Sequence, residues 1–130
     1  MAKGLGTIGA ITLFVDDVEQ SKAWYVAAFG LPVTYEDDVS AVITLDNTII
    51  NLLKRSAADG LIAPAEVARP GGGSTAQYTF WVEDVDTESA DLTARGILLL
   101  NGPMNRDWGM RTAAFADPDG HIWELAQSLS

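Results

Sequence analysis

The stretch that decides the fold is Ile11–Val18, ITLFVDDV, together with its near repeat 67 positions later, Tyr78–Val85, YTFWVEDV. Four of the eight aligned residues are identical. Each stretch alternates apolar with mixed side chains, which is typical of a half-buried strand, and each carries an acidic residue that can cap a following helix. The repeat predicts that the chain contains two copies of one structural unit.

Working outward from each copy gives the same order of elements. A predicted helix follows the first strand of each copy and ends at a glycine, Gly30 or Gly96. Three short strands then follow, separated by polar turns. The predicted elements are 8–15, 18–29, 34–36, 41–45 and 49–53 in the first half, and 75–82, 84–95, 97–100, 111–116 and 121–126 in the second. Each half is therefore predicted to be a βαβββ unit.

A break in pattern separates the halves. Between residues 55 and 74 the chain is rich in alanine, contains Pro64 and Pro70, and ends in the glycine run 71–73. This composition favours a flexible connection over a further strand. We therefore expect one domain, residues 1–130, made of modules at about 7–54 and 75–127 joined by the linker 55–74.

The composition narrows the possible functions. The 8 Lys and Arg residues stand against 18 Asp and Glu residues, so the formal charge is −10. A chain this negative repels phosphate backbones and anionic membrane surfaces, so we expect neither nucleic acid nor membrane as a partner. Cysteine is absent and histidine occurs once, which excludes disulfides and zinc–thiolate sites. Residues 1–6 lack a long apolar core, and we expect a cytoplasmic protein.

Strand alternation predicts which side chains line a groove. Helices cover one face of each half-sheet and leave the other for a groove shared by the two halves. The first strand places Thr12 and Phe14 on that second face, and the repeat places Gln77, Thr79 and Trp81 there. A mixed polar and aromatic face suits a small-molecule site.

Three motifs carry a family resemblance over nearly the whole chain: ITLFVDDVEQSKAWYVAAFGLPV at 11–33, FWVEDVDTESADLTARG at 80–96 and WGMRTAAFADPDGHIWEL at 108–125. With them the sequence resembles the vicinal oxygen chelate superfamily of glyoxalases, bleomycin-resistance proteins and extradiol dioxygenases. The resemblance implies an α+β fold in which the two βαβββ repeats form a cupped eight-stranded mixed sheet around a cavity. It also implies a homodimer in which a second chain completes that cavity.

Enzymes of this superfamily hold a divalent metal with four side chains, and the resemblance places those positions at Ala10, Asn51, Gln77 and Glu124. Alanine offers no donor, and the two amides offer only neutral oxygens. One carboxylate does not hold a catalytic metal alone, and a symmetric dimer repeats the same residue types. We therefore expect no cofactor, with a divalent metal as the less favoured alternative.

The sequence leaves two functions open. The first is a metal-free binding protein that sequesters an aromatic or cationic natural product or antibiotic, as the bleomycin-resistance branch does. The second is a lyase, isomerase or dioxygenase acting on a small oxygenated substrate, with Glu124 as its only candidate catalytic residue. The expected ligand-binding residues are Phe14, Asn51, Gln77, Trp81, Trp108, Arg111 and Glu124.

Several further aromatic residues and the single histidine are expected to lie outside the ligand site. Trp24, Tyr25 and Phe29 recur at helical spacing and are expected between helix and sheet. Trp123 shares the strand parity of His121, opposite to that of Glu124, so both are expected to point away from the cavity.

Overall fold

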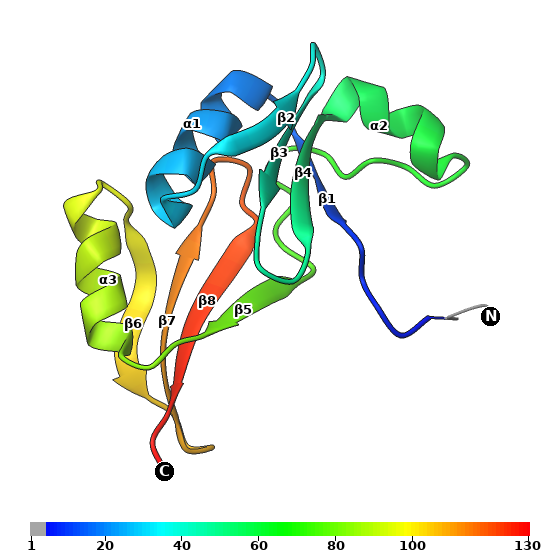
Figure 1. Cartoon of the computed structure of the whole chain (residues 1–130). Helices are drawn as coiled ribbons and strands as arrows, with labels where there is room; N and C mark the ends of the chain where they lie inside the picture. The colour runs from blue at the N-terminus through cyan, green and yellow to red at the C-terminus, as the bar shows by residue number, and fades with distance from the viewer. Residues whose placement is uncertain (1–4) are drawn as a thin grey trace. The chain divides into compact units, whose positions relative to one another are not determined.

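The computed structural model describes residues 5–130; residues 1–4, part of the N-terminal stretch considered above, lie outside the described residues. The chain divides into two compact units, the first ending at Pro70 and the second beginning at Gly71 (Figure 1). The first contains β1 (Ile11–Val15), α1 (Val18–Phe29), β2 (Val33–Glu36), β3 (Ser40–Thr44), β4 (Ile49–Lys54) and α2 (Arg55–Ile62). The second contains β5 (Gln77–Trp81), α3 (Val85–Ala94), β6 (Leu99–Asn105), β7 (Met110–Ala116) and β8 (Ile122–Ser128). The predicted βαβββ order is confirmed in both halves.

The two units have the same sheet topology. Hydrogen bonds group the eight expected strands into two four-stranded sheets, ordered β1-β4-β3-β2 and β5-β8-β7-β6, rather than into one continuous eight-stranded ladder. In each sheet the first strand pairs in parallel with the last, and the remaining pairs are antiparallel. The predicted α+β class with mixed sheets is confirmed.

The sequence signals at the helix ends act as predicted. Asp17 caps α1 by accepting a hydrogen bond from the backbone N–H of Gln20 at 3.1 Å, and Gly30 ends the helix in the left-handed region at φ 68°. Asp84 caps α3 in the same way through the N–H of Thr87 at 3.1 Å. These bonds satisfy donors that a helix start otherwise leaves unpaired, so both helices begin where the aspartates stand.

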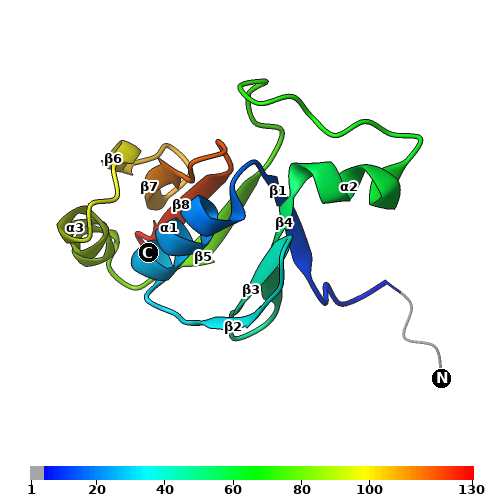
Figure 2. The same cartoon turned by 90° about the horizontal axis from the view of Figure 1, so that it is seen from above.

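The segment predicted to be a flexible linker differs from that prediction, because its first eight residues form the helix α2. Figure 2 shows α2 continuing directly from β4. No side chain caps its start, and Gly60 lies within it, so the sequence carries no helix signal here. Packing forms the helix instead: Ala58 is fully buried, and Arg55 bonds Asp16 through Nε at 2.6 Å and the carbonyl of Ala68 at 2.6 Å.

Each unit has its own core between a helix and one face of its sheet. In the first unit Tyr25 of α1 is fully buried and meets Phe29 edge-on at 5.1 Å between ring centroids. In the second, Trp123 of β8 is 2% exposed and stacks on Phe80 at 5.4 Å. The expectation of an interior position is confirmed for Tyr25 and Trp123, whereas Trp24 and Phe29 are half-buried. No helix within the described residues is long and apolar enough to cross a membrane.

Candidate functional site

The second unit has one sheet face packed on α3 and one turned away from it. Leu125, Phe115 and Trp123 are buried on the α3 side, and the side chain of Gln127, with the same parity, accepts a hydrogen bond from the N–H of Val85 at the start of α3. The alternating side chains therefore define the opposite face. We call it the face opposite α3; it comprises Gln77, Thr79, Trp81, Thr112, Ala114 and Glu124.

Glu124 stands at the centre of this face with a bonded hydroxyl beside it. The register pairs Thr79 on β5 with Glu124 on β8, and Thr79 Oγ1 donates to Glu124 Oε1 at 2.8 Å. The next row pairs Trp81 with Ala126, and Trp81 is 78% exposed. A half-buried carboxylate next to a large exposed ring can accept from a donor or cation on an aromatic ligand.

The first unit repeats this arrangement with neutral chemistry. Thr12 on β1 pairs with Asn51 on β4, and Asn51 Nδ2 donates to Thr12 Oγ1 at 3.4 Å. Phe14 follows on the same face, half-buried and paired with Leu53. Two of the sequence-predicted site residues, Phe14 and Asn51, thus share one face of the first sheet, whereas Gln77, Trp81 and Glu124 share one face of the second.

Arg111 lies on the other side of its sheet from Glu124. Its guanidinium makes a two-pronged ion pair with Asp86 of α3, with Nε and Nη2 each 2.9 Å from a carboxylate oxygen, and a further bond to Asn105 at 3.0 Å. This pairing lowers the pKa of Asp86 and raises the pKa of Arg111, because each hydrogen bond stabilises the charged form of its partner. Arg111 joins β7 to α3 and is not brought together with the other predicted ligand residues.

Arg106 is the arginine that approaches the face opposite α3. Its Nε donates to Thr112 Oγ1 at 2.9 Å, and its guanidinium lies 5.8 Å from the centroid of the Trp108 ring. Trp108 is 68% exposed. A tight turn, closed by the N–H of Gly109 on the carbonyl of Arg106, brings the two together. Alternation along a strand cannot be followed through such a turn, so sequence reasoning proposed Arg111 as a ligand-binding residue and had no signal for Arg106.

His121 is held in the turn before β8. Its Nδ1 is 2.7 Å from Asp117 Oδ2, and the other oxygen of Asp117 accepts from the backbone N–H groups of Asp119 and His121. Asp117 is 5% exposed. The only imidazole of the chain therefore orders a turn and is not placed beside Glu124.

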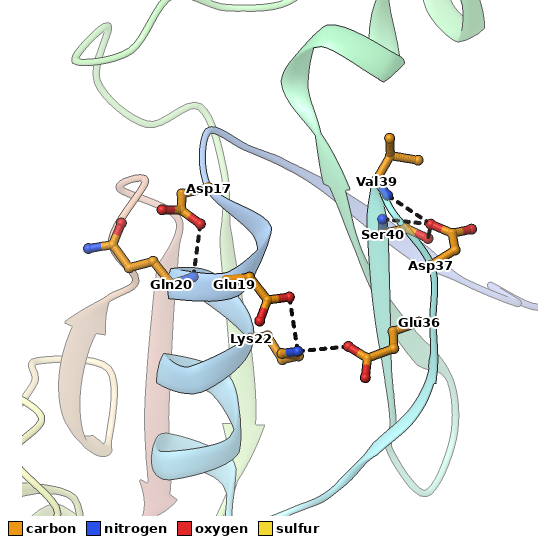
Figure 3. A network of polar contacts seen from close by, with 8 residues as sticks. All are labelled: Asp17, Glu19, Gln20, Lys22, Glu36, Asp37, Val39 and Ser40. Carbon is orange, nitrogen blue, oxygen red and sulfur yellow. Dashed lines mark hydrogen bonds and ion pairs between the residues drawn. The ribbon is translucent and has the colours of Figure 1, made fainter.

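A polar network ties the helix of the first unit to its edge strand (Figure 3). Lys22 of α1 bonds Glu19 at 3.0 Å and Glu36 of β2 at 2.7 Å, and these carboxylates raise the pKa of Lys22. Next to it, Asp37 accepts from the N–H groups of Val39 and Ser40, which lowers the pKa of Asp37. These contacts pair Lys22 with carboxylates and tie α1 to β2.

The residues at the superfamily's metal positions do not fit a divalent metal. In the first unit those positions hold Ala10 and Asn51, which supply neither a carboxylate nor an imidazole. In the second they hold Gln77 and Glu124, and the carboxylate already accepts from Thr79. No cluster of three His, Cys, Asp or Glu suited to a metal occurs within residues 5–130. The donor set contradicts a metal centre of the kind that the superfamily's enzymes use.

Comparison with known proteins identifies the same superfamily as the fold and the sequence motifs. Residues 7–125 match the sequence profile of the Glyoxalase/Bleomycin resistance protein/Dioxygenase superfamily. The protein belongs to this superfamily. A relative, YraH of Bacillus subtilis (strain 168), is 32% identical over 123 residues, which cover 92% of this chain and 96% of YraH.

Two solved structures show the same fold. One is a glyoxalase/bleomycin resistance protein/dioxygenase from Nocardioides, with a TM-score of 0.88 at 23% identity, covering 99% of this chain and 87% of that one. The other is TnmS3, an antibiotic binding protein from Streptomyces sp. CB03234, with a TM-score of 0.71 at 24% identity, covering 98% and 99% of the two chains. At these identities the likeness concerns the fold alone.

Proposed function

We propose that this protein is a metal-independent small-molecule binding protein that sequesters an aromatic natural product or antibiotic carrying a positive charge or a hydrogen-bond donor. The observation that carries the proposal is the half-buried Glu124, bonded to Thr79, on the same face as the exposed Trp81. The fold is compatible with such a role, since TnmS3 is an antibiotic binding protein. The donor set at the superfamily's metal positions supports binding without a metal.

The chemistry of the face defines the ligand class. A flat ring stacked on indole gains about 0.5–1.5 kcal/mol beyond the area that it buries. A cation or donor on that ring can reach Glu124, whose Oε1 already accepts one hydrogen bond and whose other oxygen has further acceptor capacity. The net charge of −10 also speeds the approach of a cation at low salt.

A simple matched pair of compounds tests the proposal. Protonated 2-(aminomethyl)naphthalene should bind saturably in a calorimetric titration, and more tightly than the neutral 2-(hydroxymethyl)naphthalene. Glu124→Gln should weaken the amine by about tenfold or more and leave the alcohol nearly unchanged, because only the charged contact is lost. Glu83→Gln, which removes an exposed carboxylate, is the control. If neither compound binds, or if Glu124→Gln weakens both equally, the proposed recognition by Glu124 is wrong.

Glu124 also supports the enzymatic alternative, because it is the carboxylate on this face and general bases of this kind act on small oxygenated substrates. A lyase or isomerase would lose turnover in Glu124→Gln while keeping substrate affinity. A binding protein would lose affinity. The two readouts separate the alternatives for any substrate that the protein is found to convert.

We further propose that the protein is a homodimer. The superfamily resemblance implies that a second chain completes the cavity, in which case the exposed Trp81 lines that cavity together with the ligand instead of facing solvent. Sedimentation equilibrium at micromolar concentration should give about twice the chain mass of 13.9 kDa. A monomeric mass over the whole concentration range would contradict this.

A further inference from the structure

Arg106 is half-buried and has no carboxylate partner among the described residues, unlike three other basic side chains. Lys22, Arg55 and Arg111 each contact a carboxylate within 3.0 Å. The polar contacts of Arg106 among the described residues are with neutral groups, namely Thr112 and Asn101. Its guanidinium thus keeps an uncompensated positive charge although the side chain is half-buried. An anionic group is the natural partner for such a charge.

The guanidinium is also held in a fixed orientation. Nε donates to the hydroxyl of Thr112, which is 2% exposed, at 2.9 Å, and Nη2 reaches Asn101 Oδ1 at 3.4 Å. An arginine has five N–H donors, so these two bonds leave most of them available. A planar fork that is oriented in advance suits a planar acceptor such as a carboxylate, which takes two parallel hydrogen bonds.

The sheet register relates Glu124 to Asn101, one of the two residues that Arg106 contacts. Glu124 pairs with Ala114, and Ala114 pairs with Asn101, the residue that Arg106 contacts. Neighbouring strands are about 4.8 Å apart, so Glu124 and Asn101 lie about 10 Å apart across the sheet. The residue between them has only a methyl side chain. Because the Arg106 guanidinium bonds Thr112 and Asn101, a positive group lies on the same face as the negative Glu124 and about two strands away, a spacing on the scale of a rigid ligand of two fused rings.

We propose that Arg106 is the anion-recognising side chain of the face opposite α3, and that the ligand is a dipolar aromatic molecule with a carboxylate or similar planar anion at Arg106 and a cation or donor at Glu124. This inference rests on the proposed function and adds a second charged group to the ligand. Trp108, whose ring lies 5.8 Å from the guanidinium and is exposed, provides a surface on which the anionic end of the ring system stacks.

The test adds a carboxylate to the compound used above. 6-(Aminomethyl)-2-naphthoic acid and its methyl ester differ only in the anion. In calorimetric titrations of the full chain the acid should bind about tenfold more tightly than the ester, since only the carboxylate accepts two charge-assisted hydrogen bonds from the guanidinium. Arg106→Gln should abolish this difference and leave the affinity for the ester nearly unchanged.

Arg95→Gln is the matched control, because it removes the same charge from an exposed position in the same unit. It should preserve the preference for the acid. Arg106→Lys keeps the charge but not the planar fork and should keep only part of the preference, which also covers the case in which Arg106→Gln folds poorly.

The outcomes separate the two proposals. If the amine and the ester bind but the acid gains nothing, or gains equally in Arg106→Gln, the role of Arg106 is wrong and the proposed function stands. If the naphthalene amines and the acid all fail to bind, both proposals are overturned.

Discussion

The two units share a backbone plan and differ in the chemistry of one face. At matched positions the first unit has Thr12 bonded to Asn51 at 3.4 Å, and the second has Thr79 bonded to Glu124 at 2.8 Å. A neutral amide in one unit thus corresponds to a charged carboxylate in the other. The repeated topology therefore places the side chains of Asn51 and Glu124 on equivalent faces. The residue type at this position, amide or carboxylate, then determines whether the face can bind a cation.

In both units an ion pair links the helix to the sheet. In each unit one basic residue joins the helix to the sheet through a carboxylate: Lys22 of α1 with Glu36 of β2, and Arg111 of β7 with Asp86 of α3. The donor comes from the helix in one case and from the strand in the other. The ion pair is therefore common to both units although the residues that supply it are not equivalent.

Substitutions in the two cores are expected to have the largest effect on stability. Leu52 of β4 and Leu125 of β8 occupy matched strand positions and are 0% and 5% exposed. Replacing either with alanine should lower the free energy of unfolding by about 2–5 kcal/mol, because the lost contacts leave a cavity. Urea unfolding followed by circular dichroism measures both variants. A cost below about 1 kcal/mol for only one of them would show that the two cores are not equivalent.

The second test concerns the packing of the edge strand β6 against β7. Gly102 in β6 has φ +82°, and a Cβ built on it would lie 2.7 Å from the Cα of Ala113 in β7. Gly102→Ala should cost about 2–4 kcal/mol of unfolding free energy, from the left-handed backbone and from the steric clash. Gly120, at φ +90° with nothing within 4 Å of such a Cβ, is the control and should cost only about 1–2 kcal/mol. Equal costs for the two variants would mean that β6 moves freely away from β7.

Two buried serines should respond in opposite directions. Ser40 donates to Asp37 at 2.9 Å, so Ser40→Ala should cost about 1 kcal/mol of unfolding free energy. Ser89 of α3 is 3% exposed, and its hydroxyl has no hydrogen-bond partner among the described residues. Ser89→Ala should leave stability unchanged or raise it by up to about 1 kcal/mol, since alanine also favours the helix. A loss of stability in Ser89→Ala would reveal a partner for this hydroxyl in solution.

The smallest expected effect is a pH dependence. Arg111 lowers the pKa of Asp86 below its ordinary value of 3.8. The folded protein then binds fewer protons than the unfolded chain, so this contribution to stability is complete above pH 3.8 and is lost as the pH falls below it. Asp86→Asn should make stability less steeply dependent on pH in that acidic range. Thermal unfolding from neutral to acidic pH measures the slope.

Asp37 offers the corresponding test in the first unit. Hydrogen bonds from the N–H of Val39 and from the hydroxyl of Ser40, not a cation, lower the pKa of Asp37. High salt should therefore reduce the slope caused by Asp86 more than that caused by Asp37, because salt screens an exposed ion pair. An equal response to salt would contradict the assigned causes.

Much of the fold was predictable because its signals are local. The helix α1 was predicted over its observed range. Its cap was expected from Asp16 or Asp17, of which Asp17 is the cap, and the cap of α3 was expected from Asp84. The alternation in ITLFV and QYTFW correctly separated Leu13 and Phe80 from Thr12 and Thr79. The helix α2 was not predicted, because burial of Ala58 and the bonds of Arg55 form it in a segment without helix signals.

The sequence by itself determined the repeated order of elements and the parity of each strand, since caps, turns and alternation depend on neighbours within a few residues. The tertiary structure alone decided which arginine meets which partner. Arg111 faces Asp86, 25 residues earlier, and Arg106 turns toward Thr112 through a tight loop. Contacts of this kind depend on strand register and on the packing of a helix onto a sheet, which bring together side chains that no local pattern connects.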